Sequence, residues 1–422
     1  MAKKFIDLFA GCGGLSLGLQ AAGLEPCFAI EAHPDAFATY KANLLRGNEA
    51  ARAWPNWLPQ TAHDIIEVLG NYTDELRQLR GSVQVVAGGP PCQGFSTNGR
   101  RDPKDPRNRM VASYLSLVGL VAPQIVLLEN VRGFTSMEHE EGGTFSDFVA
   151  ARLRELGYDV WSELLFAADW GVPQRRPRFF LVAVKAGLLQ GVNPFERLRV
   201  ARKTFLATRG LANGPTPVGE AIGDLESCRA GVYPDPEFGE LGYSAIRYLQ
   251  PRKLSAFAKL MRRNASGQPT DLRLPRHSAE VSDRFARILE TCPRGRSLSP
   301  TDRERLGIRK RCTTPMDRDL PSSTITTLPD DIIHYSEPRV LTVREHARLQ
   351  SFPDWFSFKG PYTSGGKQRK TACPRYTQVG NAVPPLLAEA LGEMLLGLLA
   401  TIDDQGLVDG GEVLSVRSKE PA

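Results

Sequence analysis

The feature that most constrains the fold is the alternation of strand-like and helix-like segments across residues 5–184. Runs of β-branched and apolar residues predict strands, and a 3.6-residue periodicity predicts the helices between them. The predicted strands are 5–9, 27–30, 83–87, 124–128, 158–166 and 178–184, and the predicted helices are 15–22, 35–45, 110–121 and 145–156. Apolar strands that alternate with helices are typical of a parallel sheet covered on both faces. We therefore predict a doubly wound α/β sheet, which the last two strands can close as a hairpin.

The chain changes character after Lys185. Residues 186–338 are rich in Pro, Gly and Arg and contain few periodic runs, which predicts a second domain of irregular or mixed-β structure. Periodicity returns from Leu341, and residues 384–400 predict a strongly apolar helix. The tail from Asp403 is polar, and we expect it to fray.

The sequence shows no sign of a membrane or export segment. No stretch approaches the roughly 20 apolar residues that a membrane span needs. The N-terminus begins Met-Ala-Lys-Lys and lacks the apolar region and cleavage site of a signal peptide. We expect a cytoplasmic protein without a membrane partner, and 422 residues are enough for two domains.

The seven cysteines are scattered along the chain, at positions 12, 27, 92, 228, 292, 312 and 373. They form no CxxC pair and no cluster with histidine, so the sequence indicates neither a disulfide framework nor a zinc site. We expect no metal cofactor. A free thiol is by default a small buried apolar residue, so a functional cysteine must be identified from its surroundings.

Positive charge is concentrated in one segment. Residues 251–311 contain sixteen Lys or Arg against six Asp or Glu, whereas the whole chain has a net charge of only +6. A basic block in an otherwise mildly acidic chain indicates binding to a phosphate backbone. A solvated basic surface would produce the same count, so both interpretations stay open.

A glycine-rich turn, DLFAGCGG at residues 7–14, follows the first predicted strand. Glycines let a ligand approach the backbone closely, and the N-terminal amides of the next helix can hold an anionic group. Glu31, at the end of the second predicted strand, can accept hydrogen bonds from ribose hydroxyls. The turn lacks the GxGxxG fingerprint, and no GK[ST] follows it. It fits a nucleoside cofactor that carries a carboxylate, or it is purely structural.

Cys92 stands just after a strand end, in GGPPCQGFS, at the edge where an open parallel sheet binds its ligands. The paired prolines stiffen the turn that carries the thiol. Because free cysteine has a pKa of about 8.5, a nucleophilic role needs positive charge or amide dipoles nearby. The basic segment 98–107 that follows contains Gly and Pro and is a candidate lid.

Two further segments place charged side chains at the same edge. Glu129 follows the apolar run 125–128 and is an acid/base candidate. Arg176 and Arg178 lie in QRRPR, where strand spacing puts them on one face. The sequence thus predicts a thiol, a carboxylate and guanidinium groups at one end of the sheet.

These blocks resemble the DNA (cytosine-5)-methyltransferase family. The segments that match the family's motifs I, II, IV, VI, VIII, IX and X, in order, are DLFAGCGGLSLGL, Glu31, GGPPCQGFS, ENV, QRRPRF, LTVREHARLQSFP and QVGNAVPPLLAEALG. The compact chain is similar to enzymes of the prokaryotic or phage modification type. The resemblance implies a Rossmann-like catalytic domain over 1–185 and 369–402. It also implies a target-recognition domain over 186–368, and it leaves a polar tail over 403–422.

The resemblance implies catalytic roles for individual residues. Cys92 would add to C6 of a cytosine that is flipped out of the duplex, while Glu129 hydrogen-bonds the N3/N4 edge. Arg178 would contact O2 of the base, with Arg176 and Gln174 supporting the pocket.

The resemblance also implies a methyl donor, S-adenosyl-L-methionine, with S-adenosyl-L-homocysteine as the product. The residues expected to bind it are Asp7, Phe9, Gly11, Gly13, Glu31, Asp64, Ile65, Pro90, Asn381 and Ala382. Gln93 and Ser96 belong to the loop expected to close over the flipped base.

The run LTVREHARLQSFP is interpreted as structural. Leu341, Ala347 and Leu349 are expected to pack inside the protein. Arg344 and Glu345 are expected to form a local charge pair or to brace the junction between the domains.

Double-stranded DNA is the expected substrate, and we expect a monomer. A restriction endonuclease of the same system is a candidate partner. Two other functions stay open at this point: an RNA (tRNA) cytosine-5 methyltransferase, and a catalytically silent homologue that only binds DNA. The long basic insert favours DNA over tRNA, and the intact residues Cys92, Glu129 and Arg178 argue against the silent homologue.

Overall fold

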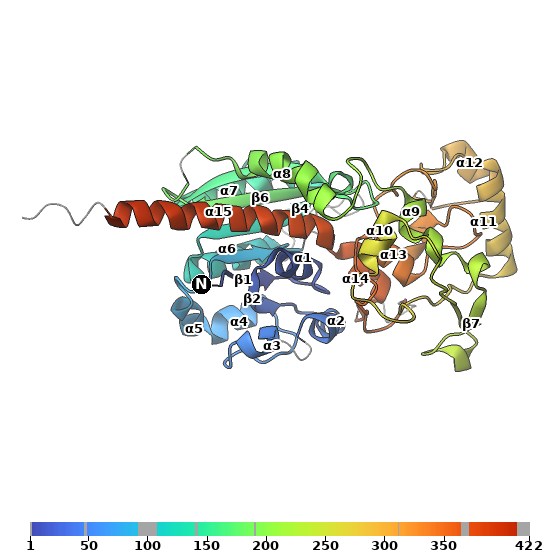
Figure 1. Ribbon diagram of the computed structural model, residues 1–422, viewed down its shortest axis with the longest axis horizontal. Coiled ribbons are helices and arrows are strands. Elements are labelled where there is room, and N and C mark those ends of the chain that lie inside the picture. The colour runs from blue at the N-terminus through green and yellow to red at the C-terminus, as the bar shows by residue number, and fades with distance from the viewer. Residues whose placement is uncertain are drawn as a thin grey trace, which may run out of the picture.

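The structure is a computed structural model that describes residues 2–45, 49–91, 108–139, 142–189, 191–310, 312–363 and 371–411. Its central element is a six-stranded sheet. The strands are β1 (Lys4–Leu8), β2 (Glu25–Ile30), β3 (Val85–Gly88), β4 (Ile125–Val131), β5 (Tyr158–Phe166) and β6 (Pro177–Lys185). Figure 1 shows this α/β part beside a second part that carries the later, shorter helices.

The order of the strands across the sheet is β2-β1-β3-β4-β6-β5. The first four strands are mutually parallel, whereas β6 runs antiparallel to both β4 and β5. The predicted α/β sheet and its closing hairpin are therefore confirmed. The hairpin folds back so that β6, not β5, lies next to β4, which brings the start of β6 to the end of β4.

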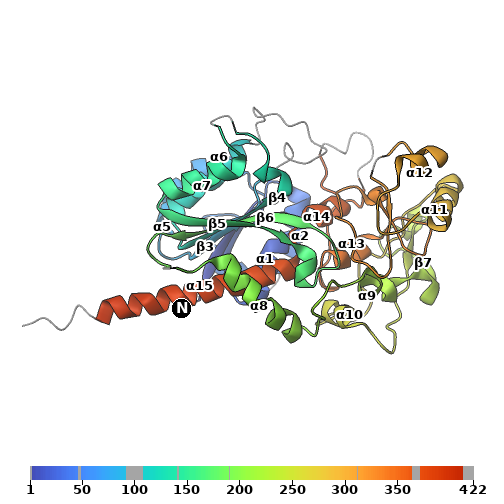
Figure 2. The same ribbon diagram turned by 90° about the horizontal axis from the view of Figure 1, so that it is seen from above.

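Helices cover both faces of the sheet, because successive strand residues point to opposite sides. Phe5, Val85 and Ile125 point into one core with α1 (Gly14–Ala22), α8 (Pro194–Thr208) and α15 (Pro385–Gly411). Ile6 and Val86 point into the other core. That core is covered by α2 (Pro34–Leu44), α3 (Glu49–Ala53), α4 (Ile65–Asn71), α5 (Thr73–Gln78), α6 (Asn108–Val121) and α7 (Phe145–Glu155). Figure 2 shows α6 and α7 on one side of the sheet and α8 and α15 on the other.

The C-terminal helix α15 is longer than predicted, since it continues through the segment expected to fray from Asp403 and ends at Gly411. Asp403 forms an ion pair with Lys3 at 2.6 Å, and Ile402 is buried, so this stretch is held beside the residue that precedes β1. Residues 412–422 lie outside the described part of the chain.

The same segment corrects the expectation about membrane spans. The helical stretch Arg375–Gln405 is long enough to cross a membrane and has a mean hydropathy of 1.6 in its most apolar window. In the structure 67% of that window is buried. A Cβ atom at Gly18 of α1 would come within 2.4 Å of the Cβ atom of Ala388 in α15, so the two helices touch backbone to backbone. The apolar residues of α15 thus form protein core.

The second part of the chain mixes short helices and short strands around its own small core. The helices are α9 (Val218–Ile222), α10 (Ala256–Met261), α11 (Ala279–Thr291), α12 (Pro300–Arg305) and α13 (Val343–Leu349), followed by α14 (Arg375–Asn381). Two small sheets pair β7 (Val232–Pro234) with β8 (Ser244–Ile246) and β9 (Thr314–Pro315) with β10 (Ile332–Ile333). Phe285, Ile288 and Leu306 are among the residues of a separate core under α11 and α12.

The charged residues of α13 are buried and pair with residues outside the helix. Of the two alternatives expected for Arg344 and Glu345, the local charge pair does not form, whereas the brace between the domains stays a prediction. Arg344 lies 3.5 Å from Asp271, and Glu345 accepts from Arg339 at 2.7 Å. Arg344 and Glu345 are neighbours in the helix and point to different sides, because consecutive helical positions do not face each other.

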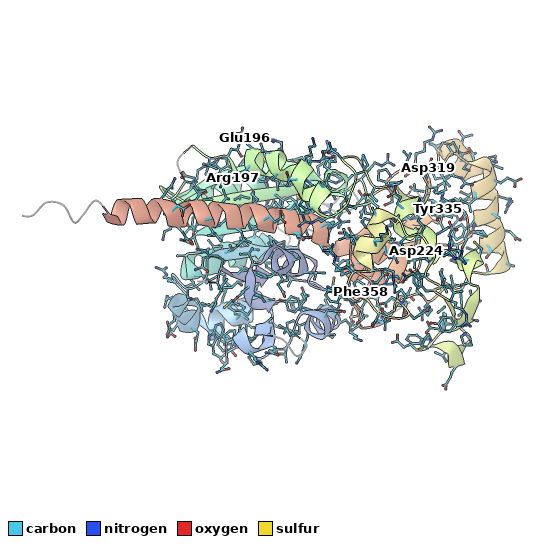
Figure 3. All side chains as sticks on the ribbon, viewed as in Figure 1. Glu196, Arg197, Asp224, Asp319, Tyr335 and Phe358 are labelled. Carbon is cyan, nitrogen blue, oxygen red and sulfur yellow. The ribbon has the colours of Figure 1, made fainter. Side chains whose placement is uncertain are left out.

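Arg348 is another fully buried charged group of α13, and its loss should destabilise the protein strongly. It is 0% exposed and lies 2.6 Å from Asp224, which Figure 3 labels, and 2.7 Å from Asp354. Arg348→Met would remove the cation that the buried Asp224 and Asp354 share, and among the described residues Asp354 would keep only its 3.2 Å pair with Arg262. We expect the free energy of unfolding in urea to fall by about 3–5 kcal/mol.

A matched control for this prediction is Arg77→Met. Arg77 pairs with Asp74 at 2.9 Å, but the two side chains are 58% and 83% exposed. Because exposed ion pairs contribute about 0–1 kcal/mol, this variant should lose little stability. Equal losses in the two variants would contradict the buried role of Arg348.

Candidate active site

Four strands bring their ends to one edge of the sheet. Leu8 at the end of β1 is paired with Gly88 at the end of β3, and Gly88 is paired with Leu128 of β4. On the other side of β4, Val131 is paired with Arg178, near the start of β6. Segments that are far apart in the sequence thus meet where open α/β sheets bind their ligands.

Glu129 and Arg178 form an ion pair at this edge. The Nε atom of Arg178 lies 2.9 Å from Oε1 of Glu129, and the two side chains are only 12% and 13% exposed. Burial raises the pKa of Glu129 above its ordinary value, although Arg178 and then Arg176 act to lower it. Glu129 therefore holds a proton more readily than an exposed carboxylate, which suits a group that acts as a general acid.

The turn that follows β3 is packed directly on Glu129. A Cβ atom at Gly89 would come within 2.8 Å of Oε2 of Glu129, so a larger residue there would displace the carboxylate. The buried Asn130 donates a hydrogen bond from Nδ2 to the carbonyl oxygen of Pro90 at 3.4 Å. Gly89 and Asn130 are not among the site residues predicted from the sequence, although both stand in the GGPP and ENV blocks that could have indicated them.

Cys92, Gln93 and Ser96 lie outside the residues that the structure describes. Their predicted roles therefore stay predictions. The structure does describe Pro90, which is buried two residues after the end of β3, and Pro91, which is half-buried. The described segment 49–91 thus ends at this edge of the sheet, one residue before Cys92.

Arg176 is fully buried beside the ion pair. It donates from Nη1 to the carbonyl oxygen of Ile325 at 2.9 Å and from Nη2 to that of Gly380 at 2.7 Å. Burial and the nearby Arg178 lower the pKa of Arg176, whereas Glu129 raises it. Arg176 thus joins β6 to two distant segments, and a direct contact with substrate stays a prediction.

Gln174 is also fully buried, two residues before Arg176. It forms an isolated parallel bridge with Ser322, and its Oε1 accepts from the backbone N–H of Ile325 at 2.8 Å. The start of β6 is therefore tied to the second part of the molecule. A role of Gln174 in supporting the pocket stays a prediction.

The glycine-rich turn between β1 and α1 has an unusual backbone. Phe9, Gly11 and Gly13 have φ angles of 59°, 57° and 97°, in the left-handed region that side-chain-bearing residues rarely adopt. Such strain at Phe9 costs on the order of 1–3 kcal/mol and is concentrated at ligand sites in proteins. A Cβ atom at Gly11 would meet no atom of the described residues within 4 Å, whereas one at Gly14 would come within 2.3 Å of the carbonyl oxygen of Val383. One side of the turn is open, and the C-terminal segment closes the other.

Glu31 is held at the end of β2 by this turn. Its Oε2 accepts from the N–H of Gly11 at 2.9 Å, and its Oε1 accepts from that of His33 at 2.7 Å. Burial raises the pKa of Glu31, although the two N–H groups act to lower it. The carboxylate is thereby oriented next to the open side of the turn.

Asp64 and Ile65 lie beside Glu31, because the N–H of His63 donates to the carbonyl oxygen of Glu31 at 2.9 Å. Asp64 begins α4 as its N-cap and accepts from the N–H of Ile66 at 2.7 Å. Ile65 is 1% exposed. The structure thus brings these two expected cofactor residues to the end of β2.

Asp7 is a buried carboxyl group with unused acceptor capacity. Its Oδ2 accepts from Oγ of Ser16 at 2.6 Å, whereas its Oδ1 has no hydrogen-bond partner within the described part of the chain. Burial raises the pKa of Asp7 to about 7, against the hydrogen bonds of Ser16. Because an unpartnered buried acceptor costs about 1–3 kcal/mol, a ligand that donates to Oδ1 would be stabilised here.

The turn between α14 and α15 completes the surroundings of the glycine-rich turn. Asn381 is the exposed last residue of α14, and Ala382 is its C-cap. The thiol of Cys12 lies 3.6 Å from the carbonyl oxygen of Gln378 in the same helix. Residues from four parts of the sequence therefore surround the ends of β1, β2 and β3.

In the ranges that the structure describes, no group of three or more His, Cys, Asp or Glu could hold a metal ion.

Known proteins resemble this chain over nearly its whole length. The family described as C-5 cytosine-specific DNA methylase matches residues 3–397. Type II methyltransferase M.XorII of Xanthomonas oryzae pv. oryzae is 32% identical and aligns with 93% of this chain and 84% of that protein. Type II methyltransferase M.DdeI of Desulfomicrobium norvegicum is 31% identical, over 93% of this chain and 88% of that protein.

Solved structures share the fold. A candidate DNA modification methyltransferase encoded within an Escherichia coli prophage superposes with a TM-score of 0.63 at 24% identity, over 94% of this chain and 100% of that chain. The Dnmt2 methyltransferase of S. pombe superposes with a TM-score of 0.53 at 15% identity, over 95% and 99% of the two chains. The predicted Rossmann-like methyltransferase fold is therefore confirmed.

Proposed function

This chain belongs to the C-5 cytosine-specific DNA methylase family, and from that premise we propose how its residues act. It is a DNA cytosine-5 methyltransferase of the restriction–modification type. In the proposed mechanism Cys92 bonds to C6 of a flipped-out cytosine, and Glu129 protonates N3. The observation that carries this proposal is the buried Glu129–Arg178 pair, packed against the turn that leads to Cys92.

The proposed chemistry overcomes the weak nucleophilicity of C5. Addition of the Cys92 thiolate forms the S–C6 bond and leaves electron density at C5, while Glu129 gives its proton to N3. C5 can then take the methyl group. Loss of the C5 proton restores the double bond to C6 and breaks the S–C6 bond, which releases the thiolate, and N3 returns its proton to Glu129. Arg178 holds Glu129 through the 2.9 Å contact and is proposed to donate to O2 of the base.

S-adenosyl-L-methionine, the methyl donor implied by the family, supplies an activated methyl group on a sulfonium centre. Two features of the structure fit this molecule: the open space beside Gly11 and the unpartnered Oδ1 of the buried Asp7. We propose that Asp7 receives the ammonium group of the methionine and that Glu31 receives the ribose hydroxyls. The remaining residues proposed to line the site are Phe9, Gly13, Asp64, Ile65, Pro90, Asn381 and Ala382.

DNA is proposed to lie against the region 186–368, of which α8 packs on the sheet beside α15. Arg197 of α8, labelled in Figure 3, donates to the carbonyl oxygen of Gly397 at 3.0 Å.

Within the basic segment, several exposed side chains make no hydrogen bond or ion pair to another described residue. These are Arg252, Lys253, Lys259, Arg263, Arg287, Arg296 and Arg309. Such cations are available for phosphates.

Arg296, one of these exposed cations, lies near the proposed active site. Arg175 donates from Nη2 to the carbonyl oxygen of Gly295 at 2.7 Å, so the loop that carries Arg296 lies beside the start of β6.

We propose the division of the chain into a catalytic part over 1–185 and 369–402 and a recognition part over 186–368. We also propose that the enzyme acts as a monomer in the cytoplasm, with a restriction endonuclease as a partner.

The function predicts a preference for duplex DNA over tRNA. Purified protein incubated with tritiated S-adenosyl-L-methionine should label duplex DNA, and mapping of 5-methylcytosine in the expressing host should reveal one recognition sequence. The physical reason is the long basic insert, whose exposed cations can bind the phosphates of a duplex. Labelling of tRNA without DNA would establish an RNA enzyme. If calorimetry detects no binding of the methyl donor, the protein is a silent homologue.

A further inference from the structure

Two buried glutamine side chains form a continuous hydrogen-bonded chain between distant segments. Gln350 and Gln174 are both 0% exposed. Nε2 of Gln174 donates to Oε1 of Gln350 at 2.9 Å and to the carbonyl oxygen of Leu349 at 3.2 Å. Gln350 follows α13 as its C-cap, and Gln174 stands just before β6. The two amides therefore join the recognition region to the catalytic sheet.

Backbone groups at both ends fix the direction of this chain. At one end, Nε2 of Gln350 donates to the carbonyl oxygens of Val379 at 2.8 Å and Ala382 at 3.4 Å. At the other end, the N–H of Ile325 donates to Oε1 of Gln174 at 2.8 Å. Carbonyl oxygens only accept and N–H groups only donate, so each amide has a single orientation that satisfies its neighbours.

The orientation of Gln174 matters because Arg176 lies next to it. Nη1 of Arg176 is 3.5 Å from Oε1 of Gln174, and Nη2 is 3.3 Å from the carbonyl oxygen of Ala382, which Gln350 also binds. If Gln174 turned over, it would present its NH₂ group to the guanidinium and lose the bond to Ile325. The N–H of Ile325 and Oε1 of Gln350 would then lose the hydrogen bonds that Gln174 makes with them.

The segments around this network cannot shift independently. A Cβ atom at Gly380 would come within 2.3 Å of the carbonyl oxygen of Thr326, so α14 lies against the 322–327 segment without space between them. Ser351, with a left-handed φ of 62°, accepts from the N–H of Leu386 at 3.1 Å. Consecutive residues, Gln350 and Ser351, thus hold both ends of the turn between α14 and α15.

We propose that Gln350 is a positioning residue that keeps Arg176 and the 379–386 turn at fixed positions relative to each other. This inference rests on the proposed function, in which the turn borders the methyl donor and Arg176 stands beside Glu129. Gln350 touches neither the base nor the donor. It acts by fixing the Gln174 amide and the carbonyl oxygen of Ala382. Through these two groups it sets the distance between Arg176, which stands beside Glu129, and the turn that borders the methyl donor.

The electrostatic consequence concerns Glu129. Burial raises the pKa of its carboxyl group, and Arg178 and Arg176 oppose that effect in this order. A guanidinium that moves away from Glu129 would let its pKa rise further. The protonated form would then persist to higher pH. The limb of the pH–rate profile that belongs to Glu129 should move upward when Gln350 is replaced.

The test is Gln350→Met, which keeps similar volume and removes all three side-chain hydrogen bonds. With both substrates saturating, we expect kcat to fall by roughly 10- to 100-fold, because small misplacements at the reacting groups have effects of that size. We also expect the Glu129 limb, which is the limb that Glu129→Gln removes, to move to higher pH. Gln350→Glu is the second variant. It keeps the acceptor for Gln174, loses the donor to the two carbonyl oxygens and should move the limb in the same direction.

The matched control is Gln378→Met. Gln378 is 3% exposed, and its side chain also makes three hydrogen bonds, with Thr39, Lys359 and Cys373. Both methionine variants should lower the melting temperature, but Gln378→Met should leave the Glu129 limb in place. An unmoved limb in both Gln350 variants, or an equal shift in the control, would overturn the inference. Wild-type protein that methylates no DNA would instead refute the proposed function, so the two failures are distinguishable.

Discussion

Replacing Cys92 by serine should abolish methyl transfer, with a loss of roughly 10⁴-fold or more. A serine hydroxyl is ionised far less than a thiol near neutral pH, so it cannot form the bond to C6 at a useful rate. Host DNA should carry 5-methylcytosine when the wild-type protein is expressed and none when Cys92→Ser is expressed. A duplex with 5-fluorocytosine at the target should become covalently attached to the wild type, because its C5 has no proton to lose, and should remain free with the variant.

Cys228→Ser is the matched control, since Cys228 is an exposed thiol in the recognition region. This variant should methylate DNA and form the adduct like the wild type. Equal methylation by the wild type and Cys92→Ser would exclude covalent catalysis by Cys92. An adduct that forms with Cys92→Ser would assign the nucleophile to another residue.

Glu129→Gln should lower kcat by roughly 10²- to 10⁴-fold, the range typical of a lost general acid or base. The amide has nearly the same shape, but it cannot give a proton to N3, and it loses the charge that pairs with Arg178 at 2.9 Å. Binding of the methyl donor, measured by calorimetry without DNA, should change little, because the proposed donor site lies at β1–β3. The protonated form of Glu129 is lost as pH rises through its raised pKa, so the wild-type rate should fall along that limb. The variant should lack the limb.

Glu163→Gln provides the same substitution on the same sheet, away from the site. Glu163 lies in β5 and pairs with Arg199 at 2.6 Å, on a surface where the two side chains are 29% and 53% exposed. Its kcat and pH profile should match the wild type. A Glu129→Gln enzyme that retains more than a tenth of the wild-type kcat would remove Glu129 from the acid/base role.

The elements of the catalytic sheet were predictable because they depend on local patterns. The β5 strand occupies residues 158–166 as predicted, and the other five strands differ from prediction only by a few residues at their ends. Period-2 and period-3.6 apolar patterns record which side of each segment is buried, so they identify strands and helices without a partner. The helix α15 extends further than predicted. Its added part buries Ile402 and pairs Asp403 with Lys3, a contact between opposite ends of the chain that no local pattern records.

The motif residues of the site were predictable for a related reason. Glu129, Arg178 and the 7–14 turn stand in short continuous blocks at strand ends, and parallel strands bring their carboxyl ends together. Gly89 and Asn130 stand in the same blocks, but their roles depend on contacts with Glu129 and Pro90 that spacing does not reveal. Cys92 remains a prediction from the sequence.

The sequence by itself therefore determined the sheet, the family and the candidate residues at the strand ends, all of which are encoded in neighbouring positions. Only the tertiary structure decided which partners the buried polar groups have. Arg348 meets Asp224, and Gln350 meets Gln174 across 176 positions of the chain. Burial forces every such group to find a partner. Which partner it finds depends on how segments far apart in sequence pack together, and no local pattern records that packing.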